Sequence, residues 1–286
     1  MMRHFLFGVS TPGGGFGLDE VTTVAEACGV SPTAVLWYED FAAEVPMTAL
    51  RNVLSTGRLP LVTWEPWLWR TDDVDAADSI IGSIIAGDRD DHLTGWARGL
   101  SSVGHDVQLR FGHEFNGDWY PWSPAAGVTP TEYVTAWRHV HRCFRDHGVT
   151  NVRWMWSPSA GVDNLHPLEA WYPGDDYVDV VGIDGYNWGT TQAWSRWTDP
   201  ADLFGPTVAE TRRVTDGKPM VISEVGCAEA GGDKAEWITD FVRWVAAEPD
   251  VSGFVWFEHD KETDWRIAST PRSATTMASA LSEVFS

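Results

Sequence analysis

The strongest constraint on the fold is an alternation of short apolar runs and helical segments along the whole chain. The apolar runs predicted as strands are His4–Thr11, Ala34–Phe41, Leu59–Trp67, Asp106–Glu114, Val152–Pro158, Tyr177–Tyr186, Pro219–Gly226 and Val251–Glu258. The predicted helices are Leu18–Cys28, Pro46–Leu54, Ser79–Ser102, Thr131–His147, Ala201–Val214, Lys234–Ala247 and Ser273–Phe285. The helix that should follow the fifth strand is poorly marked.

This alternation is typical of a barrel of parallel strands. The predicted strands are apolar on both faces, as parallel strands covered by helices must be. Eight strand–helix units in a chain of 286 residues fit the order and size of a (β/α)8 barrel. No linker, composition shift or low-complexity tract interrupts them. We therefore predict the α/β class and a single (β/α)8 TIM barrel domain over residues 1–286.

A glycine-rich turn leaves a dinucleotide-binding fold as the alternative. Gly13–Gly17 follow the first strand, and Glu39 and Asp40 end the second, where an acid could bind a ribose. However, Leu18 stands where the GxGxxG pattern requires its last glycine. The pattern therefore favours the barrel.

The charge of the chain restricts its partners. Forty-one acidic residues against 20 basic ones give a net charge of −21. Such a field repels phosphate groups, so we expect neither nucleic acid nor a membrane as a partner. The three cysteines, Cys28, Cys143 and Cys227, lie far apart without zinc-like spacing and are predicted to be buried thiols.

Tryptophan is the most unusual component, with 18 residues in the chain. Several occur in the clusters Trp64–Trp69, Trp119–Trp122 and Trp154–Trp156. Indole faces stack well on flat ligands such as sugar rings. We expect roughly half of these residues to fill the core and the others to bind carbohydrate.

Two carboxylates stand where a barrel carries its chemistry, at the carboxyl ends of the strands. Glu114 ends the fourth predicted strand and Glu224 ends the seventh, and these strands face each other across a barrel mouth. Two carboxyls about 5–5.5 Å apart are what retaining glycoside hydrolysis requires. Either glutamate alone could instead pair with an arginine. His113 and Glu114 begin the zinc motif HExxH, but Gly117 stands where its second histidine would be. The chain also has no GxSxG elbow.

Three segments resemble glycoside hydrolase family 26. Arg110–Trp122 is similar to the acid/base motif of that family, Val221–Gly226 to its nucleophile strand and Val180–Tyr186 to its sixth strand. The resemblance covers the whole barrel in order. It implies a retaining enzyme with Glu114 as acid/base and Glu224 as nucleophile, and it implies no metal and no cofactor.

The resemblance also implies roles for residues around these carboxyls. His113 would contact the sugar, Tyr186 would hydrogen-bond the nucleophile, and Asp184 would hold that network. Trp119 and Trp256 would line the sugar subsites. The complete predicted substrate-binding set is Arg110, His113, Asn116, Trp119, Trp122, Trp156, Asp184, Tyr186, Trp188 and Trp256.

Most members of this family are endo-β-1,4-mannanases, and others cleave mixed-linkage β-glucan or β-1,3-xylan. We therefore predict an endo-β-1,4-mannanase acting on mannan or glucomannan, with an endo-β-1,3(4)-glucanase or a β-xylanase as the alternatives. A non-catalytic carbohydrate-binding barrel is the alternative from another class. We expect a monomer acting on a β-linked polysaccharide outside the cell. A cytoplasmic location is the alternative, because Met1–Val9 is too short for a secretory signal.

Overall fold

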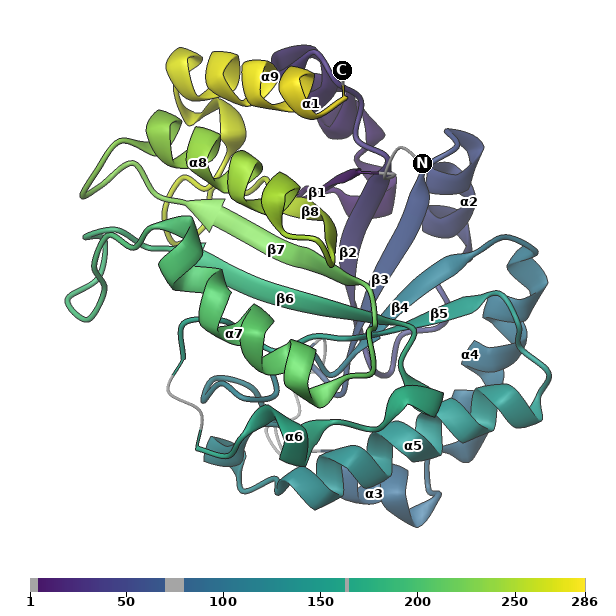
Figure 1. The fold of residues 1–286 in the computed structure, drawn as a ribbon. Coiled ribbons are helices and arrows are strands. Elements are labelled where there is room, and N and C mark those ends of the chain that lie inside the picture. Colours follow the sequence, from purple (N-terminus) through teal and green to yellow (C-terminus); the bar gives the residue numbers. More distant parts are fainter. Residues whose placement is uncertain (1–4, 70–79, 163–164, 286) are drawn as a thin grey trace.

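The structure, a computed structural model, describes residues 5–69, 80–162 and 165–285. Its centre is a closed barrel of parallel strands in chain order, β1 to β8 (Figure 1). The strands are β1 (Leu6–Ser10), β2 (Ala34–Asp40), β3 (Leu59–Glu65), β4 (Val107–Phe111), β5 (Val152–Trp156), β6 (Val180–Asn187), β7 (Met220–Cys227) and β8 (Val251–Phe257). Because β1 pairs with both β2 and β8, the sheet closes on itself. The predicted (β/α)8 TIM barrel is confirmed, and the dinucleotide-binding alternative is wrong.

Helices surround this barrel (Figure 1). The α-helices are α1 (Leu18–Cys28), α2 (Met47–Ser55), α3 (Ile81–Ala86), α4 (Asp90–Val103), α5 (Pro130–Asp146), α6 (Leu168–Trp171), α7 (Pro200–Val214), α8 (Lys234–Ala247) and α9 (Pro271–Phe285). The 3₁₀ helices are η1 (Gly14–Phe16), η3 (Pro124–Ala126), η4 (Asp175–Tyr177) and η5 (Ile267–Ser269). The poorly marked fifth helix is α6, a single turn.

Helix boundaries follow local chemistry. The predicted helix 79–102 is divided into α3 and α4, because Gly87 adopts φ +82° and ends α3 in the left-handed region. α5 begins after Thr129, which forms a capping box with Glu132, and Pro130 occupies the first helical position. The predicted starts at His4 and Ser79 lie outside the described residues.

Two apolar layers hold the barrel together. Inside the barrel lies a small cluster of Leu36, Leu61, Met155, Val221 and Val255. A larger layer lies between strands and helices and contains most of the tryptophans. Eleven of the 18 are buried, which is more than the half expected: Trp37, Trp64, Trp96, Trp122, Trp137, Trp154, Trp156, Trp171, Trp237, Trp256 and Trp265.

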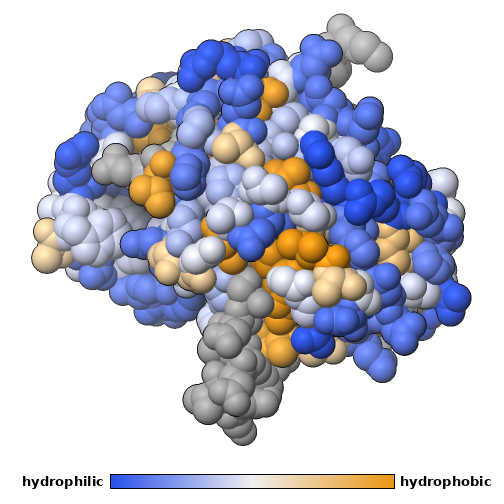
Figure 2. Space-filling view, turned by 90° about the horizontal axis from the view of Figure 1, so that it is seen from below, coloured by the Kyte–Doolittle hydropathy of each residue, from blue (hydrophilic) through white to orange (hydrophobic). Residues whose placement is uncertain are grey.

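The surface is mainly hydrophilic, as the net charge predicts. Figure 2 shows one face on which hydrophilic residues surround an apolar patch. None of the helices in the described part of the chain has the length and hydropathy to cross a membrane. All three cysteines are free thiols; Cys28 and Cys227 are buried as predicted, whereas Cys143 is only half-buried.

Candidate active site

A buried ion-pair network links three strands at the carboxyl end of the barrel. Arg110 on β4 places Nη1 2.8 Å from Asp184 Oδ1 on β6, and its Nη2 pairs with Glu224 Oε1 on β7. Its Nε and Nη2 also donate to Thr63 Oγ1 over 2.9 and 2.7 Å. Arg110 and Asp184 are both 0% exposed. This corrects their predicted role in substrate binding, because neither side chain has surface that a sugar can touch.

A register shift between β6 and β7 makes this network possible. Ile183 pairs with Ile222, but the next pair is Asp184 with Glu224, so Ser223 is an extra residue in β7. In a regular strand, consecutive side chains point to opposite faces, and a bulge relaxes this alternation. Both Ser223 and Glu224 therefore face the barrel interior. Ser223 Oγ donates to Asp184 Oδ1 over 2.6 Å.

Glu224 is held as an ionised carboxylate. Arg110 pairs with one of its oxygens, and the Tyr186 hydroxyl donates to the other. Burial on its own would raise the pKa of Glu224, but the guanidinium charge and the Tyr186 hydrogen bond outweigh it and lower the pKa to about 2. Burial raises the pKa of Asp184 to about 7, since it outweighs the Arg110 charge, and the negative charge of Glu224 adds to the rise.

Glu114 lies in the tight turn that follows β4. Its φ is +50°, which is rare for a residue with a side chain and costs about 1–3 kcal/mol. The turn is fixed by its neighbours: the Glu114 amide donates to Ser157 O over 2.7 Å, and Trp119 Nε1 donates to Glu114 Oε2 over 2.7 Å. The turn thereby points a buried carboxyl, 7% exposed, into the mouth beside β7.

Glu114 differs from Glu224 in protonation. Burial raises the pKa of Glu114 well above its usual range, and the negative charges of Glu224 and Asp184 raise it further. At neutral pH Glu114 is thus protonated and Glu224 is ionised. Such a division of states is the arrangement that acid/base chemistry with two carboxyls needs.

His113 lies beside Glu224. Its Nε2 is 3.1 Å from the Tyr120 hydroxyl and 4.0 Å from Glu224 Oε1. Its Nδ1 is buried and has no hydrogen-bond partner in the described part of the chain. Burial and the Arg110 charge lower the pKa of His113, so the ring is neutral. A neutral imidazole with a free nitrogen can bind a ligand hydroxyl.

The remaining predicted binding residues fall into two groups. Trp119 is 47% exposed, and Tyr186 and Trp188 are half-buried, so sugars can reach them. Trp122, Trp156 and Trp256 are each 0% exposed, which corrects their predicted role in stacking on sugars.

These corrections have local causes. Trp256 faces outward from β8 and donates Nε1 to Trp265 O over 2.8 Å, whereas the next residue, Phe257, faces Tyr186 with ring centroids 5.6 Å apart.

Asn116 is also buried. Its side-chain amide accepts a hydrogen bond from the Ser159 N–H over 2.8 Å and donates one to the Ser159 carbonyl over 2.9 Å. These two bonds fix the loop after β5.

The mouth also contains residues to which the sequence assigned no role. The Tyr38 hydroxyl has no hydrogen-bond partner in the described part of the chain. Glu65 at the end of β3 is 6% exposed, and burial raises its pKa to about 7. His259 stacks on Phe257 with ring centroids 3.9 Å apart and reaches Ser10 Oγ over 3.1 Å. Glu65 and His259 stand at predicted strand ends, which is the signal that could have found them.

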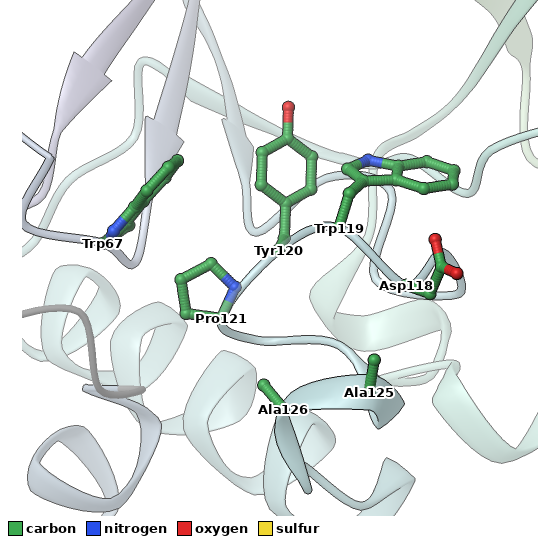
Figure 3. Close-up of a pocket in the computed structure, with 7 residues that line it drawn as sticks. All are labelled: Trp67, Asp118, Trp119, Tyr120, Pro121, Ala125 and Ala126. Carbon is green, nitrogen blue, oxygen red and sulfur yellow. The ribbon is translucent and has the colours of Figure 1, made fainter.

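An aromatic pocket of about 300 Å³ adjoins this mouth. It is lined by Trp67, Asp118, Trp119, Tyr120, Pro121, Ala125 and Ala126 (Figure 3). Figure 3 shows the rings of Trp67, Tyr120 and Trp119 extending to the same side of the loops that carry them. Because Trp119 also donates to Glu114, the pocket lies directly beside that carboxyl. Within the described ranges, no group of three or more His, Cys, Asp or Glu residues is arranged to hold a metal ion.

We expect Glu114→Gln to stabilise the protein at neutral and alkaline pH. The pKa of Glu114 is raised in the folded state, whereas in the unfolded state it is about 4.3. Above that pH only the unfolded state ionises, so the free energy of unfolding falls as pH rises. Glutamine removes this cost and keeps an acceptor for Trp119. Thermal unfolding should show a gain of about 1–3 kcal/mol at pH 8 that disappears near pH 4.

The matched control is Glu26→Gln, which changes an exposed carboxyl on α1. Its stability difference from the wild type should not vary with pH in this way. A Glu114→Gln protein that is less stable than the wild type at pH 8 would contradict the raised pKa.

Comparison with known proteins agrees with this geometry. The sequence model described as glycosyl hydrolase family 26 matches residues 70–238. Endoglucanase H of Acetivibrio thermocellus is 38% identical over 243 residues, which are 83% of this chain and 25% of that protein. A mannan endo-1,4-beta-mannosidase A and B of Caldalkalibacillus mannanilyticus is 30% identical over 138 residues, 46% of this chain and 24% of that protein. The chain thus spans about a quarter of the length of these curated relatives.

Solved structures show the same fold. The catalytic domain of an endo-beta-1,4-mannanase from Bacillus sp. JAMB-750 superposes with a TM-score of 0.71 at 21% identity, covering 99% of this chain and 87% of that one. An endo-beta-1,4-mannanase double mutant from Cellulomonas fimi gives a TM-score of 0.68 at 19% identity, covering 97% and 71%. The family match extends over more than half of the chain. The chain therefore belongs to glycosyl hydrolase family 26.

Proposed function

We propose that this chain is a retaining, endo-acting β-glycoside hydrolase in which Glu114 is the acid/base and Glu224 the nucleophile. The observation that carries the proposal is the division of protonation states between the two buried carboxyls. Tyr186 and Arg110 keep Glu224 ionised, whereas burial and the charge of Glu224 keep Glu114 protonated. Membership of the family supports the same assignment.

The reaction proceeds by two displacements. In the first, a Glu224 oxygen forms a bond to the anomeric carbon while the bond to the leaving oxygen breaks, and Glu114 gives its proton to that oxygen. In the second, Glu114 takes a proton from water, the water oxygen attacks the anomeric carbon, and the bond to Glu224 breaks. Glu114 and Glu224 thereby return to their starting states.

The protein couples the two steps electrostatically. Formation of the ester with Glu224 removes the negative charge that helps to raise the pKa of Glu114. The pKa of Glu114 then falls, so the same residue that acted as an acid becomes a base. Arg110 and Tyr186 stay in place and receive the leaving carboxylate when the ester breaks.

The mouth offers contacts to both sides of the cleaved bond. On the leaving-group side, Trp119 touches Glu114 and lines the aromatic pocket, so a sugar ring can stack there. Above Glu224, the Tyr38 hydroxyl and His113 Nδ1 are polar groups without protein partners. Both atoms are buried, and a sugar hydroxyl that reached them would offset their desolvation cost.

We propose a β-1,4-linked mannan or glucomannan as the substrate. The mannan endo-1,4-beta-mannosidase relative supports this choice. A β-glucan is the second candidate, since the relative named Endoglucanase H has the higher identity, 38%. Initial rates on glucomannan, galactomannan, lichenan and β-1,3-xylan decide between them. A chain that binds these glycans without releasing reducing ends would instead be a carbohydrate-binding barrel.

The first reducing end released should have the β configuration. Two displacements at one carbon, each with inversion, restore the starting configuration. Proton NMR during the first minutes of hydrolysis resolves the two anomers before they interconvert. An initial α signal would exclude a nucleophilic role for Glu224, whatever the substrate.

The rate should depend on pH as a bell. On the acid side kcat/KM falls as Glu224 takes up a proton, and its lowered pKa, about 2, places this limb far below neutrality. On the alkaline side kcat/KM falls as Glu114 loses its proton, and its raised pKa moves this limb upward. Rates measured from pH 1 to 10 should cover both limbs, and the alkaline limb should disappear in Glu114→Ala with an activated aryl glycoside. An unchanged limb would assign it to another group.

We propose further that one domain over residues 1–286 acts as a monomer outside the cell. Polymeric substrates do not cross membranes, which supports an extracellular site of action. The net charge of −21 also disfavours nucleic acid and anionic membranes as partners. Light scattering at 1 mg/mL or more, on the order of tens of micromolar, tests whether the protein is a monomer. Assay of the secreted fraction tests whether it acts outside the cell.

A further inference from the structure

Tyr186, which holds Glu224, is itself held by a tryptophan from an irregular segment. Trp265 lies in the segment after β8 and packs on Tyr186 with ring centroids 5.0 Å apart. It also meets Trp188 edge-on, with centroids 4.8 Å apart. A side chain added at Gly226 would contact both Trp265 and Tyr186, within 2.9 and 3.0 Å. The Tyr186 ring therefore has little freedom as long as Trp265 stays in place.

The segment that carries Trp265 has little regular structure of its own, so side chains from the barrel must fix it. Trp256 Nε1 donates to Trp265 O over 2.8 Å, and Glu258 Oε2 accepts from the Ile267 amide over 2.8 Å. Both side chains come from β8 or the position immediately after it. They bind the segment on the side that faces the barrel.

The third attachment comes from a buried lysine. Lys234, the first residue of α8, is 1% exposed. Its Nζ donates to Arg266 O over 2.7 Å, to Ser269 Oγ over 2.8 Å and to Asp264 O over 3.3 Å. These three acceptors lie on both sides of Trp265. All three ammonium hydrogens are used, so Lys234 ties the segment to α8.

This lysine stands in an unfavourable place for a cation. Burial disfavours the charged form, and the first turn of a helix carries the positive end of the helix dipole. A methionine of similar length would fill the same space without either cost. What only the ammonium group supplies is the set of bonds to the segment around Trp265.

We propose that Lys234 is a positioning residue for the nucleophile, holding Trp265 against Tyr186 and, through Tyr186, aligning and ionising Glu224. The inference rests on the proposed function in that it assigns Glu224 as the nucleophile. The path has three links: Lys234 to the backbone around Trp265, Trp265 to the Tyr186 ring, and the Tyr186 hydroxyl to Glu224.

The charged groups near Lys234 and near Glu224 determine whether Lys234 can change the pKa of Glu224 directly. The groups near Lys234 are Cys227, Glu229, Glu258 and Asp264. The titratable groups that interact with Glu224 are Tyr38, Glu65, Arg110, His113, Glu114, Tyr120, Asp184, Tyr186 and His259. Lys234 belongs only to the first set, so it can reach Glu224 through Trp265 and Tyr186 and not by a direct charge effect.

The test is Lys234→Met. We expect kcat on the preferred soluble glycan to fall about 10²-fold, the effect of misplacing a reacting group by about 1 Å, with KM changed less than about twofold. The acid limb of the rate profile should move up by about one pH unit, because Glu224 loses part of its hydrogen bond to Tyr186. A structural role alone would lower the melting temperature and leave this limb in place.

Lys218→Met is the matched control, because Lys218 Nζ also donates to a backbone carbonyl, that of Asp175, over 2.8 Å. It precedes β7 at the opposite end of the barrel and should retain wild-type kinetics. Trp265→Leu interrupts the path at its second link and should reproduce the Lys234→Met profile. It also carries the test if Lys234→Met does not fold.

The failure of this proposal can be distinguished from failure of the proposed function. If the wild type cleaves glycans and both variants keep the wild-type kcat and acid limb, the positioning role is overturned and the hydrolase assignment stands. If the wild type cleaves none, the function fails, and carboxyl carbon NMR still measures the pKa of Glu224 directly. An unchanged pKa of Glu224 in Lys234→Met would then overturn the positioning role as well.

Discussion

Glu224→Ala is expected to lower kcat by about 10⁴-fold or more while oligosaccharide binding is retained. The nucleophile forms its bond only as the transition state is approached, so it adds little to ground-state affinity. Binding comes instead from accessible aromatic groups such as Trp119 and Trp188. Calorimetry with mannohexaose and cellohexaose measures affinity, and reducing-end release measures turnover.

The variant should also fold. Removing Glu224 leaves Arg110 paired with Asp184 at 2.8 Å, so the buried guanidinium keeps one counter-charge. Circular dichroism and thermal unfolding should therefore resemble those of the wild type. Glu26→Ala, at an exposed position on α1, is the control that keeps full activity. Loss of binding together with a disordered spectrum would show that Glu224 is a structural residue.

Chemical rescue separates the two carboxyls. In Glu224→Ala, azide can enter the space left by the carboxylate, form a bond to the anomeric carbon of an activated β-aryl glycoside and displace the phenolate. This single displacement gives the α-glycosyl azide. In Glu114→Ala, azide instead attacks the ester of Glu224 and gives the β-azide. Identical products from both variants would contradict the assignment of separate roles.

The sequence was sufficient for the barrel because each strand and helix carries its own signal. Apolar runs, Pro130 at a helix start and Gly148 after a helix end are local features, and the order of the elements follows from them. Glu114 and Glu224 could be found for the same reason. Glu114 follows β4 and Glu224 lies in the last part of β7, and all strands of a barrel end at one mouth.

The sequence could not show which side chains near the strand ends point into the barrel. Simple alternation places Ser223 and Glu224 on opposite sides, and only the register shift against β6 brings both inside. At the end of β8, Trp256 was expected in the site, yet Phe257 faces the mouth and Trp256 lies in the core. Bulges and strand twist depend on the pairing of distant segments, so a single strand carries no signal for them.

The supporting contacts were missed for a related reason. Lys234 opens a helix and Trp265 lies in an irregular segment, so neither occupies a position that marks a barrel site. Their importance arises from contacts between β8, α8 and the segment after β8. Chains of contact of this kind exist only in the folded molecule.

Arg110→Met should destabilise the protein by about 3–5 kcal/mol at pH 7, the cost of removing one partner from a buried ion pair. Arg110 is the cation that compensates Glu224 inside the barrel, and both side chains are buried. Methionine fills part of the space but leaves the Glu224 charge buried. Urea unfolding measured across pH gives the difference in the free energy of unfolding between variant and wild type.

The pH dependence distinguishes lost charge pairing from lost packing. In the wild type the lowered pKa of Glu224, about 2, adds stability above its unfolded pKa, about 4.3, and this stability is lost as pH falls through about 2. In Arg110→Met the pKa of Glu224 must rise, so that contribution is absent. The deficit of the variant should therefore be greatest at neutral pH and shrink below about pH 4.

The double variant Arg110→Met, Glu224→Gln completes the argument, because it removes the uncompensated charge together with its partner. If the deficit of Arg110→Met is electrostatic, the double variant should be more stable than Arg110→Met at pH 7, with a coupling energy of about 1–3 kcal/mol. Arg153→Met, at an exposed position on β5, should change stability by less than about 0.5 kcal/mol. A deficit that is constant with pH and unrelieved in the double variant would mean that Arg110 stabilises the barrel by packing. The ionised state of Glu224 would then have to depend on Tyr186.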